Sequence, residues 1–131
     1  MEGSQLERWR RWARWIPALI WMAVIFRGSS IPGSQIPGRF STLGHLGEYA
    51  ILGALLAWAR SREWRLSRVL VFAVALASLY GISDEFHQWF VPGRMTDPVD
   101  CAADALGALL GATLVVVGVS RLRRAEEREA G

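Results

Sequence analysis

The stretch of sequence that decides the fold is residues 81–111, GISDEFHQWFVPGRMTDPVDCAADALGALLG. An apolar run ends here in Asp84 and Glu85, a Pro-Gly-Arg loop follows, and Asp100 and Asp104 precede a second apolar run with regularly spaced glycines. Ionisable residues at the ends of long apolar segments are costly in a membrane and usually mark a functional site there. The first question is therefore whether this chain is a membrane protein.

Composition favours a small membrane protein. The chain has 131 residues, enough for one domain, and 52% of them are hydrophobic, with a mean hydropathy of +0.22. Every basic residue is an arginine, and the arginines gather between apolar runs instead of along one helix face. This pattern is typical of charge that flanks membrane spans, and it predicts no nucleic-acid partner. A single cysteine, Cys101, excludes an intramolecular disulfide, and the sequence has no CxxC or HExxH motif, so we predict neither a cofactor nor a metal.

Four apolar runs predict an all-α bundle of four transmembrane helices in a single domain, residues 1–131. Length and alanine–leucine content favour helices over strands. Each clean run is shorter than the roughly 20 residues that a span needs, and reaches that length only with its polar or tryptophan-rich end. We expect an uncleaved first span preceded by an interfacial tryptophan–arginine segment, a loop at 27–41 and a frayed charged tail at 121–131. The predicted spans cover about 9–27, 42–60, 68–88 and 100–120.

Arginine counts predict the orientation of these spans. Four arginines lie in residues 8–14, four in residues 60–68 and four in the tail, whereas residues 27–41 hold two and the connection before the last span holds one. Positive charge stays on the cytoplasmic side, so both termini are predicted to be cytoplasmic in a multi-pass protein of the cell membrane.

This orientation brings three helix ends together at the extracytoplasmic face. The second span begins with His45 and Glu48, and the fourth begins with Asp100 and Asp104. The third ends with Asp84, Glu85 and Gln88. We therefore expect one polar cluster at that end of the bundle.

The local pairs in this cluster leave several interpretations open. His45 and Glu48, at i and i+3, share a helix face and suit an acid–base pair, a metal-ligand pair, a ligand-binding pair or a buried hydrogen-bonded tie between helices. Adjacent Asp84 and Glu85 suit either a divalent cation or an ion pair with Arg94, and we prefer the ion pair. His87 points away from the face of Asp84 and is expected at the level of the headgroups.

The small residues of the last span have a simpler interpretation. Gly107 and Gly111 follow Asp100 and Asp104 on one stripe of the helix. Glycines at this spacing allow another helix to approach closely, so we predict helix packing for the glycines and a polar network for the two aspartates.

Taken together, these motifs resemble the VanZ-like family. They are H-x-x-E-Y at 45–49, S-D-E-x-x-Q at 83–88, V-P-G-R at 91–94, and D-x-x-x-D at 100–104 ahead of G-x-x-x-G. The resemblance runs from Thr42 to Gly111 and implies a small integral membrane protein; founding members of the family are associated with low-level resistance to teicoplanin-type glycopeptide antibiotics. The family usually has lysine where this chain has Thr42, and often asparagine where it has Asp104.

The leading prediction is a non-enzymatic membrane protein that binds an anionic cell-envelope or lipid-linked ligand at its outer face, with membrane lipids as its surroundings. Arg94 would hold the phosphate or carboxylate of the ligand. The predicted ligand-binding residues are His45, Glu48, Tyr49, Asp84, Glu85, Gln88, Arg94, Asp100 and Asp104.

Two alternatives stay open. The first is a membrane-embedded, metal-assisted enzyme that acts on a lipid-linked headgroup, with His45, Glu48, Asp84 and Glu85 as candidate catalytic residues. The second is a cluster that only locks the helices together while the protein acts through a partner.

Overall fold

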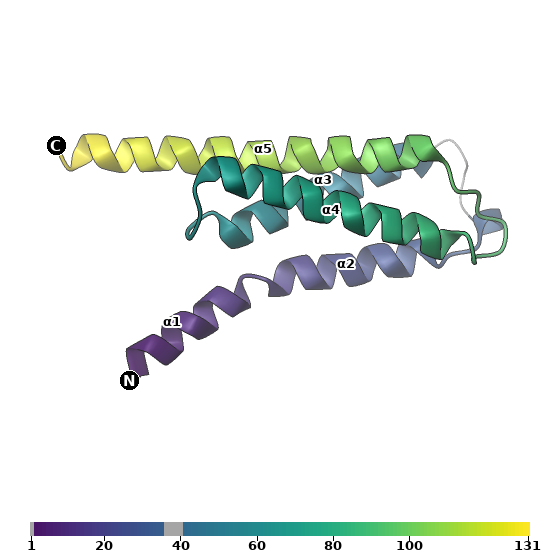
Figure 1. The fold of residues 1–131 in the computed structure, drawn as a ribbon, viewed down its shortest axis with the longest axis horizontal. Coiled ribbons are helices and arrows are strands. Elements are labelled where there is room, and N and C mark those ends of the chain that lie inside the picture. Colours follow the sequence, from purple (N-terminus) through teal and green to yellow (C-terminus); the bar gives the residue numbers. More distant parts are fainter. Residues whose placement is uncertain (1, 36–40) are drawn as a thin grey trace.

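The computed structural model describes residues 2–35 and 41–131, and every regular element within them is helical, as predicted (Figure 1). The elements are α1 (Glu2–Ala13), α2 (Ile16–Ser29), a short 3-10 helix η1 (Gly33–Gln35), α3 (Ser41–Arg60), α4 (Leu66–Gln88) and α5 (Pro98–Glu129).

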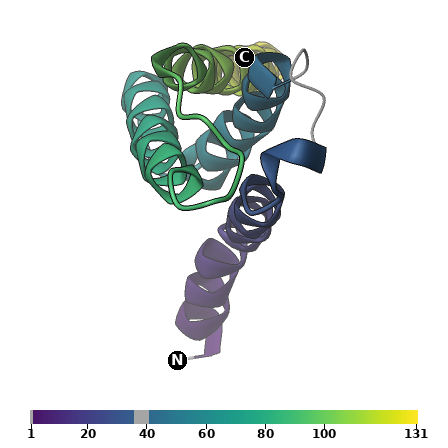
Figure 2. The ribbon, with the colours of Figure 1, turned by 90° about the vertical axis from the view of Figure 1, so that its right-hand side faces the viewer.

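Helices α3, α4 and α5 form the body of the bundle, α2 lies beside them, and α1 turns away from them (Figures 1 and 2). The most extensive packing joins α3 to α5, and α4 packs on both. The core between the helices is built from small and branched side chains around one buried tyrosine, and includes Tyr49, Leu52, Leu56, Val69, Ala73, Ala77, Ala108 and Ala112.

Small residues bring α3 and α5 into close contact. A methyl group added at Gly111 would overlap the carbonyl oxygen of Ala50, and one added at Gly107 would overlap the carbonyl oxygen of Leu46. From the other side, Gly53 of α3 faces the backbone of Ala108. The prediction that Gly107 and Gly111 serve helix packing is therefore confirmed.

The first predicted span, 9–27, is not one continuous helix. α1 ends at Ala13 and α2 begins at Ile16, with Pro17 in its first turn. Proline has no backbone N–H to bond to the preceding turn, so it suits the start of a helix and interrupts a continuous one. α2 also runs to Ser29, three residues into the segment predicted as a loop.

The charged tail is helical where fraying was expected. α5 continues through the arginines and glutamates of the tail to Glu129. Arginine, alanine, leucine and glutamate are strong helix formers, so the tail extends the helix that precedes it.

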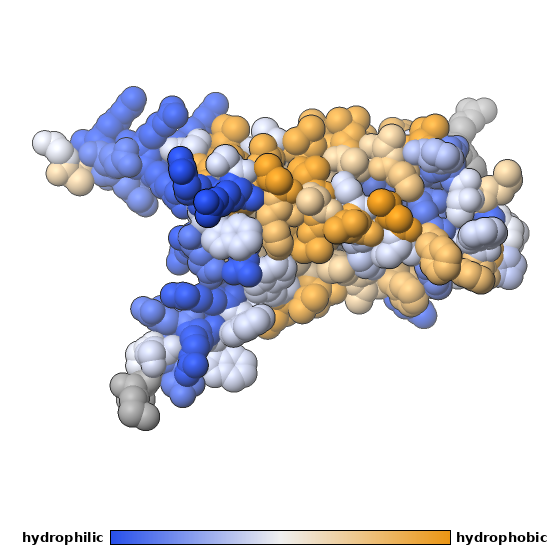
Figure 3. Space-filling view, viewed as in Figure 1, coloured by the Kyte–Doolittle hydropathy of each residue, from blue (hydrophilic) through white to orange (hydrophobic). Residues whose placement is uncertain are grey.

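Two helices, α4 and α5, are long and apolar enough to cross a membrane by length and composition. Only 22% and 28% of their most apolar 18-residue windows are buried, so most of that apolar surface faces outward. α2, with 14 residues, is too short for the same test, and α3 has 20 residues but a more polar first half around His45 and Glu48. Figure 3 shows hydrophobic residues across the middle of the bundle and hydrophilic residues over α1 and the far end of α5.

The arginine-rich segments meet at the end of the bundle where α3 ends. The Arg14 guanidinium bonds to the carbonyl oxygen of Trp58 and, at 3.2 Å, to Ser61 Oγ. Arg123 of α5 donates to the carbonyl oxygen of Ser61 at 2.5 Å. The three segments counted as cytoplasmic from the sequence thus lie at one end of the molecule.

Candidate functional site

The opposite end of the bundle is shaped by one loop and two helix ends. Asp97 caps the start of α5, since its Oδ1 accepts a hydrogen bond from the backbone N–H of Val99 at 2.9 Å, and Pro98 follows in the first turn. Gly93 has a φ of +73°, which the loop before α5 needs in order to turn. The backbone N–H of Gly33 donates to the carbonyl oxygen of Pro92 at 3.1 Å and fastens this loop to η1.

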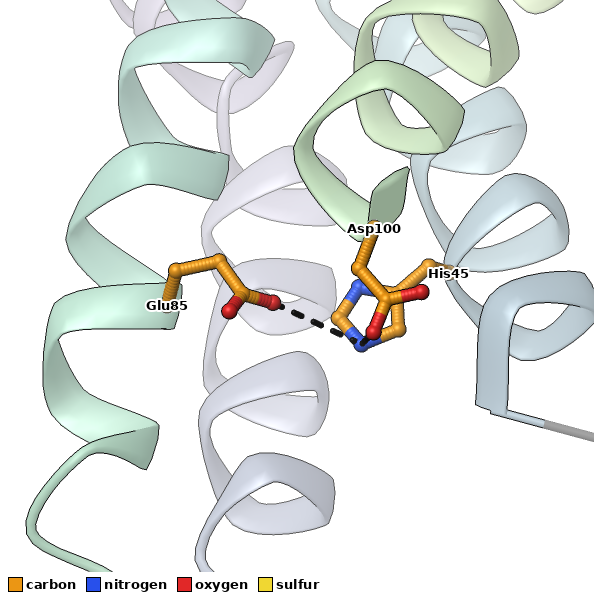
Figure 4. Close-up of side chains that lie close together, drawn as sticks. All are labelled: His45, Glu85 and Asp100. Atoms are coloured by element: carbon orange, nitrogen blue, oxygen red, sulfur yellow. Dashed lines mark ion pairs between the residues drawn. The ribbon is translucent and has the colours of Figure 1, made fainter. Parts of the chain in front are cut away.

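His45 lies at the centre of the polar residues at this end and is 5% exposed. Its Nδ1 is 2.9 Å from Asp104 Oδ1, and its Nε2 is 3.9 Å from both Glu85 Oε1 and Asp100 Oδ2. Figure 4 shows Glu85 reaching the imidazole from α4 and Asp100 reaching it from the start of α5. One residue of α3 thus meets carboxylates from both neighbouring helices.

Asp104 is fully buried because α4 leaves room for it. Gly81 of α4 faces it, and a Cβ at that position would come within 2.6 Å of Asp104 Oδ2. Oδ1 takes the hydrogen bond to His45, and Oδ2 has no hydrogen-bond partner.

Asp84 faces α2 instead of the imidazole. Its Oδ2 accepts hydrogen bonds from Ser29 Oγ at 2.7 Å and from Gln88 Nε2 at 3.1 Å, and all three side chains are buried. Asp84 and Gln88 therefore share a helix face, as predicted, and a hydrogen bond joins them there.

Glu48 and Tyr49 follow His45 on α3 by about one helical turn. The Glu48 side chain is half-buried, lies beside Gly28 of α2, and interacts electrostatically with His45 and Arg94. In the part of the chain that the structure describes, no hydrogen bond joins Glu48 to His45. Tyr49 is fully buried, its ring lies parallel to that of His45 with centroids 6.3 Å apart, and its hydroxyl has no hydrogen-bond partner among the described residues.

Arg94 does not form the ion pair that we preferred. Among the residues described, no carboxylate lies within 4.0 Å of its guanidinium nitrogens, and its buried Nε has no hydrogen-bond partner. The loop is held by backbone bonds instead, including Arg94 N–H to the carbonyl oxygen of Val91 at 3.2 Å. Among the described residues, the guanidinium thus forms no direct ion pair, and its interaction with Glu48 acts over a longer distance.

The structure adds two residues with hydroxyl groups to the site, and neither was predicted as a site residue from the sequence. Ser29 lay in the predicted loop, and only its position one helical turn after Ile25 at the end of an apolar run hinted at a helix. Thr42 donates to Asp100 Oδ1 at 2.7 Å, so the residue that replaces the family lysine fixes a carboxylate.

His87 stays outside the cluster. Its Nε2 is 3.0 Å from Ser30 Oγ, and its ring stacks on Phe26 at 4.4 Å, so it ties α4 to α2.

In the group of residues that we call the polar cluster, acidic side chains outnumber basic ones. The cluster holds one imidazole and five carboxylates, and among the described residues one buried oxygen each of Asp84 and Asp104 has no hydrogen-bond partner. Buried carboxylates are stable only when they are protonated, hydrogen-bonded or paired with a cation. The arrangement is suited to taking up protons or a positive ion. The cluster consists of His45, Glu48, Tyr49, Asp84, Glu85, Gln88, Asp100 and Asp104.

The whole of this end falls within one family match. The model of the VanZ/LLP1 family matches residues 14–119, which is most of the chain. The chain belongs to the VanZ/LLP1 family. This confirms the family predicted from the motifs at 45–49, 83–88, 91–94 and 100–104.

The VanZ/LLP1 match covers α2, α3 and α4 completely, leaves out α1, and ends within α5. No curated protein and no solved structure matches the chain. The roles of individual residues in this VanZ-like protein are therefore argued from its own geometry.

Proposed function

We propose that this VanZ-like protein is a multi-pass, non-enzymatic membrane protein that binds an anionic cell-envelope or lipid-linked ligand at its extracytoplasmic end. The observation that carries the proposal is the guanidinium of Arg94, which forms no ion pair among the described residues and interacts with Glu48 only at longer range. An arginine kept free beside the end of a bundle is suited to a phosphate or carboxylate from outside the protein.

Membrane insertion is supported by the outward apolar surface of α4 and α5. Leu79, Ile82, Leu110 and Leu114 are each at least half exposed. Such surface is stable against lipid but not against water. In the proposed arrangement α2 and α3 complete four spans, and the polar ends of α3, α4 and α5 lie in or just below the headgroup region.

Orientation is supported by the position of the arginines. The three arginine-rich segments share one end of the bundle and the polar cluster lies at the other. Because arginine is retained on the cytoplasmic side, the cluster and Arg94 would face outward. The exposed Trp89 and Phe90 beside the loop suit the outer interface, and the exposed Trp9 and Trp12 of α1 suit the inner one.

A direct test is the binding of a short-chain polyprenyl diphosphate to the protein in detergent micelles. We expect Arg94→Ala to weaken binding at least about tenfold, because a charge-assisted bond to an anion contributes roughly 1.5–3 kcal/mol. Arg27→Ala is the matched control, since Arg27 is an exposed arginine in the last turn of α2 at the same end. Equal affinities of both variants and the wild type would refute the role of Arg94.

The proposal extends to glycopeptide resistance. A host expressing the wild-type protein or Arg27→Ala should tolerate more teicoplanin than a host without it, and the Arg94→Ala variant, at equal membrane abundance, should lose that advantage. Unchanged susceptibility of the host expressing the wild type would remove antibiotic resistance from the proposal and leave ligand binding to be judged by the diphosphate assay.

A further inference from the structure

Within the polar cluster, His45, Glu85 and Asp100 converge on one point from three different helices (Figure 4). Each offers one ligand atom, these atoms lie within 4.8 Å of one another, and all three residues are buried. We propose that His45 Nε2 and the carboxylates of Glu85 and Asp100 bind one divalent transition-metal cation of the Zn²⁺ or Mn²⁺ class.

Asp104 sets the imidazole for this role. His45 Nδ1 is 2.9 Å from Asp104 Oδ1, a distance at which Nδ1–H donates to the carboxylate. The lone pair of Nε2 is then directed at Glu85 and Asp100. A histidine that binds a metal through one nitrogen commonly donates its other N–H to a carboxylate, which fixes the tautomer and the ring orientation. The pair of His45 and Asp104 has this form.

The distances between the ligand atoms suit an ion better than direct hydrogen bonds. Both carboxylate oxygens are 3.9 Å from Nε2, whereas a hydrogen bond needs about 2.7–3.2 Å. Two ligands placed about 2.1 Å from a tetrahedral zinc ion lie about 3.4 Å apart. Closing the site on an ion would shorten each distance to Nε2 by about half an ångström and bring the two carboxylate oxygens, which lie within 4.8 Å of each other, up to about 1.4 Å closer together.

Glu85 supplies an independent sign of a missing partner. It is 6% exposed, and among the described residues no side chain donates a hydrogen bond to its carboxylate, which is stabilised only from the backbone of Asp97. By contrast, Asp84 has Ser29 and Gln88, and Asp100 has Thr42. A buried carboxylate with no side-chain donor, 3.9 Å from an imidazole nitrogen, would be stabilised by a cation at that point.

The ligand set narrows the class of ion. Mg²⁺ and Ca²⁺ prefer six or more oxygen ligands, and an imidazole nitrogen with two carboxylates suits Zn²⁺ or Mn²⁺ better. Three protein ligands leave one position of a tetrahedral ion for water or for an oxygen of another molecule. The metal site stands on the geometry of these residues and does not depend on the proposed anionic ligand or on Arg94.

The test is equilibrium dialysis of the detergent-purified full chain against Zn²⁺ alone, followed by metal analysis, with Mg²⁺ as a comparison. We expect one Zn²⁺ per chain, and a loss of at least tenfold in affinity in both Glu85→Gln and Asp100→Asn. Asp84→Asn is the matched control, because it removes a buried carboxylate of the same cluster that points to α2, and it should bind like the wild type. Co²⁺ in place of Zn²⁺ should give the visible absorption of a four-coordinate ion.

Each outcome decides the question. The absence of stoichiometric metal in the folded wild-type protein would overturn the site and leave a proton between His45 and its carboxylates. Zinc that binds equally well to both ligand variants, or that Asp84→Asn weakens as strongly as they do, would overturn the assignment of the ligands. Circular dichroism and size exclusion establish that each variant is folded, and the two carboxylate variants preserve the test if a change at His45 prevents folding. If the protein binds no zinc but still binds the diphosphate, the metal site is refuted while the proposed function stands.

Discussion

Replacement of Gly111 by alanine measures how much the close approach of α3 and α5 matters. A Cβ at this position would overlap the carbonyl oxygen of Ala50 and lie 3.1 Å from its Cα, so the added methyl group meets backbone that cannot rotate away. The two helices must separate instead. Overpacking of this kind costs about 1–3 kcal/mol, and contact with backbone points to the upper part of that range.

Gly118 of the same helix provides the matched control, because a methyl group there meets nothing within 4 Å. Both substitutions gain the same helix propensity, about 0.8–1 kcal/mol in favour of alanine over glycine. The propensity gain therefore cancels when the variants are compared with each other. The difference in their free energies of unfolding should equal the overpacking cost alone, about 1–3 kcal/mol, with Gly111→Ala the less stable.

The assay is equilibrium unfolding of both variants in the same mixed detergent micelles, followed by circular dichroism. Tryptophan fluorescence supplies a second probe, and coincident transitions would justify a two-state treatment. Equal stabilities of the two variants would refute the view that α3 and α5 are packed as tightly as Gly111 indicates. It would mean that the helices can separate at no cost.

Two further predictions concern the polar cluster. Asp104→Asn keeps an oxygen that accepts the Nδ1–H of His45, so this variant should bind Zn²⁺ nearly as well as the wild type in dialysis. Asp104→Ala removes that oxygen and should bind Zn²⁺ about 10–100-fold more weakly. Equal affinities of the two variants would contradict the role of Asp104 in orienting the imidazole. Ser29→Ala removes the hydroxyl that donates to Asp84 at 2.7 Å and should cost about 1.5–3 kcal/mol in detergent unfolding, against about 0.5–1.5 kcal/mol for Ser30→Ala, whose hydroxyl bonds to the carbonyl oxygen of Phe26 and to the ring of His87. A larger loss for Ser30→Ala than for Ser29→Ala would show that Asp84 does not need its serine donor.

The sequence predicted the helical class and the meeting of three helix ends because both depend on patterns of whole segments. Apolar runs of helix length give the class, and alternating arginine counts place the starts of α3 and α5 beside the end of α4. The glycine stripe of α5 was equally readable, since Gly107 and Gly111 share a face in any helix. These features do not require knowledge of which side chains touch.

The partners of individual side chains were not predictable in the same way. A hydrogen-bonded tie from His45 to another helix was one of the alternatives left open, but the sequence did not name its partner, which is Asp104, 59 residues later. That choice depends on the register of α3 against α5, which no local pattern fixes. Arg94 was paired with nearby acids by charge alone, although backbone bonds of the loop hold it away from them. Ser29 was missed because the end of α2 was placed too early.

The packing of α3 on α5 and the geometry of the polar cluster have the same origin. Asp104, Gly107 and Gly111 lie on one stripe of α5, and this stripe faces the segment of α3 that begins at His45. The contact of Gly107 with the backbone of Leu46, the residue next to His45, fixes how near the imidazole can come to Asp104. A bulkier residue at Gly107 would therefore lengthen the 2.9 Å contact of His45 with Asp104 and widen the gap to Asp100 without changing any polar group. Small residues where α5 packs on α3 are thus as necessary for the site as the charged residues that form it.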